Sequence, residues 1–187
     1  MKFKIINLFV ILGFLITSCQ ENKTIQNKEK TTRIVSLNGA ISEIIVELGH
    51  ESNIVATDIT SNYPEKINKL PKVGHNRSIQ AEGVLAQDPD LVVGIEKQLD
   101  PKVLKQIRSS GVKVVLFNQE YSIEGTKKLI REITDSLNLE YINDSINILI
   151  DQPIKKLQKF KKTPKVLFIY ARGAGTILVA GKNTQMD

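Results

Sequence analysis

Residues 91–117 read LVVGIEKQLDPKVLKQIRSSGVKVVLF, and their pattern predicts one complete strand–helix–strand unit. The runs Leu91–Gly94 and Val112–Phe117 are apolar and rich in β-branched residues, which is typical of buried strands. Between them, Asp100 followed by Pro101 indicates the start of a helix, because proline is favoured at the first helical position. Two strands joined by a helix predict a parallel pair with a right-handed crossover.

The same alternation continues outward from this unit in both directions. The chain before it predicts two strands and two helices, and the chain after it predicts one helix capped by Ser122. The predicted strands are 33–37 and 53–57, and the predicted helices are 41–48, 78–86 with Ser78 as its N-cap, and 122–137. This order predicts an α/β lobe over residues 33–140, with a mostly parallel sheet covered by helices on both faces.

The pattern changes at residues 141–161, where apolar side chains recur at steps of three or four. This spacing predicts an amphipathic helix about 30 Å long with a kink at Pro153. A helix of that length suits a strut between two lobes, so we assign residues 141–162 to an inter-lobe helix; packing on the same sheet is the alternative. The strands predicted beyond it are 165–170 and 177–180. They would begin a second α/β lobe over residues 163–187, which we expect to be incomplete in this chain.

Residues 1–18 have the pattern of a secretory signal peptide. Two lysines precede the apolar run 5–16, which would span about 18 Å as a helix, less than the ~30 Å hydrocarbon core of a membrane. Ile16-Thr17-Ser18-Cys19 then resembles a bacterial lipobox; a buried free cysteine is the alternative. We expect a lipid on Cys19 and a polar tether over residues 19–32. The protein would be anchored to a membrane of the cell envelope, facing the periplasm or the exterior.

The composition excludes several classes of site and partner. The chain has 187 residues with one Cys and two His, so neither a disulfide framework nor a cysteine-rich metal centre is predicted. Its 26 Lys+Arg against 20 Asp+Glu give a net charge of +6, part of which belongs to the leader. Because the remaining basic residues are scattered, nucleic acid is not a predicted partner.

Four stretches of the chain resemble one family of binding proteins. They are residues 33–40 (RIVSLNGA) with Glu43, residues 58–64 (DITSNYP), residues 70–77 (LPKVGHNR) running on to 81–83 (AEG), and residues 171–175 (ARGAG) with 179–184 (VAGKNT). The family is that of periplasmic binding proteins whose two α/β lobes are joined by one long helix and which serve ABC importers of haem, corrinoids and ferric siderophores. The resemblance covers residues 33–187, and the hemin-binding subgroup is the most similar.

The resemblance implies that Tyr63 is the ligand of the haem iron. Ferric iron is a hard acid, so an anionic phenolate oxygen on a loop is a suitable axial ligand. A free phenol has a pKa of about 10, and the iron together with a nearby cation would therefore have to favour its ionised form. Taken without the resemblance, Tyr63 followed by Pro64 is typical of an ordinary turn.

The resemblance also implies roles for four further residues. Arg77 and Arg172 are the cations expected near Tyr63 or near the haem propionates, although Arg77 alone is typical of a solvent-facing base. His75 stands where related sequences usually have an aromatic residue, so its role is open between a second iron ligand, a wall residue and a surface residue. Glu82 is implied to dock onto basic residues of the permease, and it also suits the N-terminus of a helix.

These observations predict a lipid-anchored substrate-binding protein that captures hemin and delivers it to an ABC permease driven by an ATPase. Haem is the transported ligand; no catalytic cofactor is expected, and the chain is not expected to be an enzyme. The alternative within the class is a ferric siderophore or corrinoid (vitamin B12) binder. A small α/β enzyme using the glycine turn 173–175 would lack both a nucleophile elbow and a phosphate-binding lysine. A non-functional fragment is the last alternative.

Overall fold

The computed structural model describes most of the chain from Thr32 onward: residues 32–75, 77–139, 143–157, 162, 165–171, 173, 175–182 and 184. These residues belong to the second of two compact units, Met1–Thr31 and Thr32–Asp187. The predicted signal peptide, the lipidation site Cys19, all but the last residue of the predicted tether, and Arg172 lie outside the described residues.

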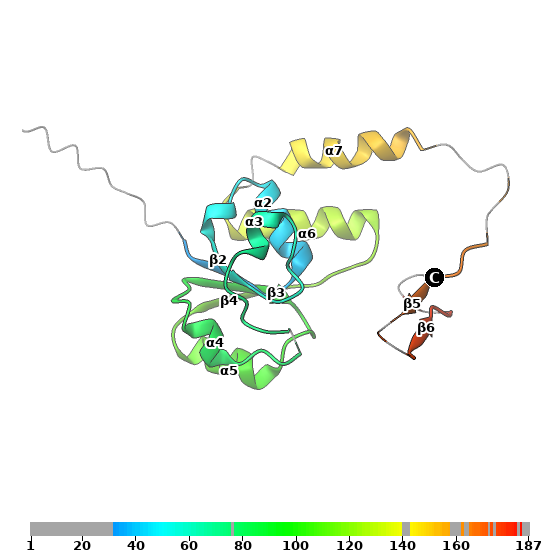
Figure 1. Cartoon of the computed structure of the whole chain (residues 1–187). Helices are drawn as coiled ribbons and strands as arrows, with labels where there is room; N and C mark the ends of the chain where they lie inside the picture. Colours follow the sequence, from blue (N-terminus) through cyan, green and yellow to red (C-terminus); the bar gives the residue numbers. More distant parts are fainter. Residues whose placement is uncertain are drawn as a thin grey trace, which may run out of the picture. The chain divides into compact units, whose positions relative to one another are not determined.

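A four-stranded sheet lies at the centre of the described region (Figure 1). Its strands are β1 (Ile34–Ser36), β2 (Ile54–Thr57), β3 (Leu91–Ile95) and β4 (Lys113–Phe117), in the order β2-β1-β3-β4. Each neighbouring pair is parallel. β3 is buried along its whole length, as expected for an apolar run in the middle of a parallel sheet. The predicted parallel sheet is confirmed.

Helices cover both faces of this sheet. The helices of the described residues are α2 (Gly39–Glu47), α3 (Glu65–Asn68), α4 (Ala81–Leu85), α5 (Pro101–Ser109), α6 (Ile123–Ser136) and α7 (Asn143–Lys155), with a 3-10 turn η1 (Glu51–Asn53). Successive strand residues point to opposite faces, so Ile34, Leu91 and Val93 pack with α2 and α6, while Val35 and Val92 pack with α4 and α5. Figure 1 shows α2 and α6 on one side of the sheet and α4 and α5 on the other.

Side-chain caps begin three of the helices, and two of these caps were predicted. Asp100 accepts a hydrogen bond from Lys102 N at 2.7 Å, and Ser122 Oγ accepts one from Gly125 N at 2.9 Å. Each satisfies a backbone N–H that has no partner within the helix. The third cap, Asn38, starts α2 at Gly39, two residues before the predicted start.

The predicted N-cap Ser78 is wrong, because this residue closes a turn instead. Ser78 N donates to His75 O at 2.7 Å, and the Ser78 hydroxyl bonds to the same carbonyl at 3.4 Å. The backbone then stays extended at Gln80, and α4 begins at Ala81 without a side-chain cap. Ser78 therefore forms hydrogen bonds within a local turn instead of capping the first turn of the helix.

The helix α7 is shorter than predicted. It has 13 residues, so it is about 20 Å long rather than about 30 Å, and Pro153 lies inside it. It packs on α6: Ile146 contacts the apolar core, and Lys127 Nζ lies 2.5 Å from Asp151 Oδ1, an interaction that raises the pKa of Lys127. Residues 158–161 lie outside the described ranges, and the assignment of 141–162 as an inter-lobe helix remains a prediction. None of the described helices is both long enough and apolar enough to cross a membrane.

An antiparallel hairpin follows, made of β5 (Ile169–Ala171) and β6 (Ile177–Val179). The first strand begins at Ile169 rather than at the predicted Lys165, and both strands are exposed along their whole length. Val166, Leu167 and Phe168 are exposed as well. The second lobe expected over residues 163–187 remains a prediction.

Two glycines at the third position of a helix should respond oppositely to alanine. A Cβ on Gly125 in α6 would meet the Glu120 carbonyl oxygen and, at 2.5 Å, the Glu120 Cβ, whereas a Cβ on Gly83 in α4 would find its nearest neighbour, Val73 O, 4.0 Å away. We expect Gly125→Ala to lower the free energy of unfolding by about 1–3 kcal/mol through overpacking. Gly83→Ala should raise it by about 0.5–1 kcal/mol, because alanine has less backbone entropy to lose. Urea denaturation of both variants measures this, and equal effects would contradict the packing of Glu120 on α6.

Candidate ligand-binding site

The strand order reverses between β1 and β3, because the chain leaves β1 towards β2 and later leaves β3 towards β4 on the other side. In open parallel sheets, ligands bind outside the carboxyl ends of the strands near such a switch point. Asn38 lies there, where its Oδ1 caps α2 and its Nδ2 donates to Gln98 Oε1 at 3.3 Å. The loops that follow the strands at this edge are therefore the first place to look for binding residues.

Backbone hydrogen bonds join two of the motif stretches at the end of β2. The bonds are Thr57 N to Pro71 O at 3.0 Å, Val73 N to Thr57 O at 2.9 Å, and Ile59 N to Gly74 O at 3.0 Å. They place the loop that carries Tyr63 beside the loop that carries His75 and Arg77. Three of the predicted site residues are thus on neighbouring loops at the carboxyl edge of the sheet.

Tyr63 is presented to solvent on the loop that follows β2. Its side chain is 67% exposed, and its hydroxyl forms no hydrogen bond with the residues that the structure describes. Together with Pro64, to which it is joined by a cis peptide bond, it lines a cavity of about 370 Å³ whose other wall is the outer face of α2, including Glu43 and Ile44. The Tyr63 phenol is therefore accessible to a molecule in solution.

His75 and Arg77 are both exposed. The backbone N–H of Arg77 donates to His75 Nδ1 at 3.2 Å, so Nδ1 is an acceptor here and Nε2 carries the proton in the neutral ring. No hydrogen bond or ion pair joins either side chain to Tyr63 within the described part of the chain. That part also has no group of three or more His, Cys, Asp or Glu side chains able to hold a metal ion. An iron bound at this edge would therefore have to bring most of its own ligands.

A buried polar network lies beneath the Tyr63 loop. Asp58, directly after β2, is fully buried; its Oδ1 accepts from Ser61 Oγ at 2.6 Å, and its Oδ2 accepts from the Thr60 N–H at 3.2 Å and from the Thr60 hydroxyl. Ser61 Oγ also bonds to Ser42 Oγ in α2 at 3.0 Å. Asp58 belongs to the motif 58–64, but no role was predicted for it from the sequence. The sequence feature that could have revealed this role is an ionisable residue directly after an apolar strand. Such a residue needs hydrogen-bond or charge partners when it is buried.

Tyr121 is a second exposed tyrosine beside α2, and the sequence interpretation missed it. It follows β4, is 58% exposed, and lines a cavity of about 530 Å³ that shares Glu43 and Ile44 with the Tyr63 cavity. Its loop is held by Lys128 Nζ, which lies 2.8 Å from Glu120 Oε1. The outer face of α2 therefore has one exposed tyrosine on each side.

A family model described as periplasmic binding protein matches residues 34–187. The chain belongs to the periplasmic binding protein family. Membership confirms the predicted α/β fold with a parallel sheet. It also confirms that the chain is not an enzyme, because this family is a non-enzymatic component of transport.

Some of the proteins similar to this chain are named for heme and others for vitamin B12. The periplasmic heme-binding protein RhuT from Roseiflexus sp. RS-1, solved in apo form, has a TM-score of 0.75 and 34% identity, over 84% of this chain and 62% of that chain. The vitamin B12-binding protein of Vibrio parahaemolyticus is 27% identical over 83% of this chain and 57% of its own length. An uncharacterized ABC transporter substrate-binding lipoprotein of Bacillus subtilis, YvrC, is 27% identical over 89% of this chain. This chain spans 55% of the length of YvrC.

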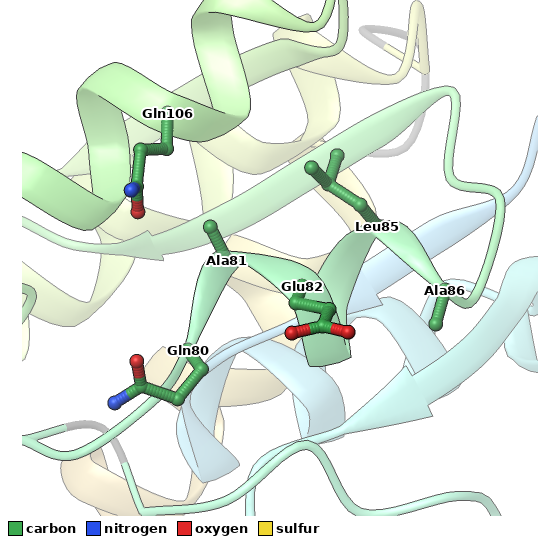
Figure 2. A pocket seen from close by; sticks show the side chains of 6 residues that line it. All are labelled: Gln80, Ala81, Glu82, Leu85, Ala86 and Gln106. Atoms are coloured by element: carbon green, nitrogen blue, oxygen red, sulfur yellow. The ribbon is translucent and has the colours of Figure 1, made fainter.

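In this periplasmic binding protein, Glu82 lies apart from the two tyrosines. It is exposed in α4, on the face of the sheet opposite α2 and α6 (Figure 1). It lines a cavity of about 590 Å³ together with Gln80 and Gln106 (Figure 2). Glu82 is the charged residue among those that line this cavity. The other lining residues are Gln80, Ala81, Leu85, Ala86 and Gln106. Glu82, the predicted docking residue, and Tyr63, the predicted iron ligand, therefore pack on opposite faces of the sheet.

Proposed function

We propose that this chain is the hemin-binding part of an ABC transporter substrate-binding protein. The observation that carries this proposal is Tyr63, an exposed phenol on the loop that follows β2, beside a cavity. The likeness to a solved heme-binding protein at 34% identity supports it. Haem is the cargo, and no catalytic cofactor is involved.

The chemistry of ferric haem suits this surface. The porphyrin provides the equatorial nitrogen ligands, so the protein needs to offer only an axial group, and a phenolate oxygen is a hard ligand for Fe(III). Arg77, on the loop beside Tyr63, would favour the phenolate or pair with a propionate. Arg172 would supply a second cation, and His75 would pack against the macrocycle or serve as a second axial ligand. Ligation through Nε2 would require its proton to move to Nδ1, which breaks the hydrogen bond from the Arg77 N–H. These assignments to Arg77, Arg172 and His75 are part of the proposal.

Titration with hemin tests the proposal, with the haem Soret absorbance as the readout. We expect saturable binding with a shifted Soret band and a ligand-to-metal charge-transfer band of the kind that tyrosinate-bound ferric haem produces. Free hemin in the same buffer is the control. A Soret spectrum that stays that of free hemin at all protein concentrations would overturn the proposal.

A corrinoid is the second candidate ligand, because some of the similar proteins are vitamin B12-binding proteins. Two exposed tyrosines flanking α2 offer flat apolar surfaces that would suit a corrin ring as well as a porphyrin. Calorimetric titration with cyanocobalamin, alone and after saturation with hemin, separates these candidates. Binding of cyanocobalamin in the absence of hemin binding would favour the corrinoid.

We further propose that the protein is a lipoprotein of the cell envelope. Lipid on Cys19, a tether over residues 19–32, and a second lobe joined through the helix at 141–162 complete this proposal. The naming of YvrC as a substrate-binding lipoprotein supports it. Mass spectrometry of membrane-extracted protein would show diacylglycerol on Cys19, and an unprocessed N-terminus would contradict it.

Delivery to the permease would use the surface around Glu82. Glu82→Lys reverses the charge of that cavity without touching the Tyr63 loop, so we expect unchanged hemin binding and hemin uptake by cells lowered by about tenfold or more. Asp135→Lys, an exposed charge reversal on α6, is the matched control and should leave both quantities unchanged. Uptake equal to wild type in the Glu82→Lys strain would contradict the docking role.

A further inference from the structure

The ammonium group of Lys72 is bonded to both flanks of the Tyr63 loop. Lys72 Nζ donates to the carbonyl oxygen of Ser61 at 2.5 Å and to that of Ile67 at 3.2 Å. Ser61 comes two residues before Tyr63, and Ile67 comes four residues after it. One side chain therefore ties together the start and the end of the segment that presents the phenol.

Lys72 is held in place from within the sheet. Its Nζ also donates to Thr57 Oγ1 at 2.8 Å, and Thr57, the last residue of β2, is fully buried. Burial lowers the pKa of the Lys72 ammonium, and the charge of Asp58 opposes this shift. Hydrogen bonds from a charged donor are stronger than those between neutral groups. The ammonium is thus a strong, fixed anchor rather than a mobile surface charge.

The opposite side of the loop is fixed by Asp58. Its carboxylate accepts from the hydroxyl of Ser61, so this serine is held by both its carbonyl and its side chain. Tyr63 itself has no such partners among the described residues and is 67% exposed. The position of its phenol is therefore set by the backbone of residues 61–67, and that backbone is set by Lys72 and Asp58.

We infer that Lys72 is a positioning residue for the ligand site: its ammonium clamps residues 61–67 and so fixes where the Tyr63 phenol meets a haem-class ligand. The expected effect of Lys72 on hemin affinity rests on the proposed function. The clamp itself is independent of the ligand, since it concerns only the backbone of the loop. A preorganised loop has less conformational freedom to lose on binding, which raises affinity.

Lys72→Met tests the inference, because methionine keeps most of the apolar stem and removes the ammonium. Amide hydrogen exchange without ligand is the first readout. We expect exchange in residues 59–67 to accelerate by about tenfold or more, with exchange in β1 and β3 unchanged. The second readout is hemin titration, where we expect affinity lowered by about 10- to 100-fold, as for other supporting partners of metal ligands.

The matched control is Lys69→Met, three residues earlier in the same segment. Lys69 Nζ pairs with Glu65 at 3.3 Å, and both side chains are largely exposed, so this change should leave loop exchange and affinity at wild-type values. If Lys72→Met does not fold, Lys72→Gln retains a neutral donor and should show the same pattern at smaller amplitude.

The outcomes separate the clamp from the proposed function. Wild-type exchange in residues 59–67 of the Lys72 variant would overturn the inference, and so would faster exchange spread evenly over β1 and β3. Faster loop exchange with unchanged hemin affinity would also overturn the positioning role. If the wild-type protein binds no hemin, the proposed function fails, while loop exchange in the Lys72 variants still decides whether the clamp exists.

Discussion

Tyr63→Phe is expected to lower the affinity for hemin by about 100-fold and to abolish the charge-transfer band of the complex. Removal of a group that only supports a metal ligand costs about 10- to 100-fold, and removal of the ligand itself should cost at least as much. The substitution removes the oxygen and keeps the ring, so stacking against the macrocycle is preserved. A Soret titration of the wild-type and variant proteins in the same buffer measures the effect.

Tyr121→Phe is the matched control for this substitution. Tyr121 is exposed to a similar degree, at 58% against 67% for Tyr63, and its cavity shares Glu43 and Ile44 with the Tyr63 cavity. Neither hydroxyl is buried, so both variants should keep the wild-type free energy of unfolding within about 0.5 kcal/mol. Unchanged affinity in Tyr63→Phe would contradict the account, and loss of affinity in Tyr121→Phe alone would assign the ligand to the other side of α2.

Asp58→Ala should give the largest loss of stability among the variants considered. Asp58 is fully buried and accepts hydrogen bonds from both Thr60 and Ser61, and its charge stabilises the ammonium of Lys72. Alanine leaves these donors without their acceptor inside the protein, which costs about 1–3 kcal/mol for each unsatisfied group and more for a charged one. We therefore expect the free energy of unfolding to fall by about 2–4 kcal/mol in urea denaturation.

A double-mutant cycle with Lys72→Met shows whether this loss comes from the network. If Asp58 and Lys72 stabilise the loop together, the double variant should lose less stability than the two single variants combined. Asp135→Ala, an exposed aspartate on α6, should change stability by no more than about 0.5 kcal/mol. A similarly small effect for Asp58→Ala would mean that the network contributes little to the fold.

The elements of the sheet could be predicted from the sequence because their signals are local. The apolar, β-branched runs at β3 and β4 and the caps at Asp100 and Ser122 depend only on neighbouring residues. The prediction for Ser78 was wrong because its hydroxyl can either cap a helix or bond within a turn. In the structure it bonds to the His75 carbonyl of the turn. The length of α7 was overestimated because periodicity extends beyond the residues that form the helix.

The site was predictable only in part, for a physical reason. Tyr63 stood out through its motif, but its exposure depends on how the loop is held. That depends on Lys72, whose bonds to Thr57, Ser61 and Ile67 form only after the segment 71–74 has paired with the end of β2. Tyr121 is likewise brought to the outer face of α2 by strand order alone. Contacts between distant segments carry no signal in a single sequence.

Resonance Raman spectroscopy of the ferric hemin complex tests the central claim most directly, because excitation in the charge-transfer band enhances the vibrations of an iron-bound phenolate. We expect tyrosinate modes in the wild-type protein that vanish in Tyr63→Phe and persist in Tyr121→Phe. A spectrum without tyrosinate modes, with the iron coordinated by histidine or by water alone, would contradict it.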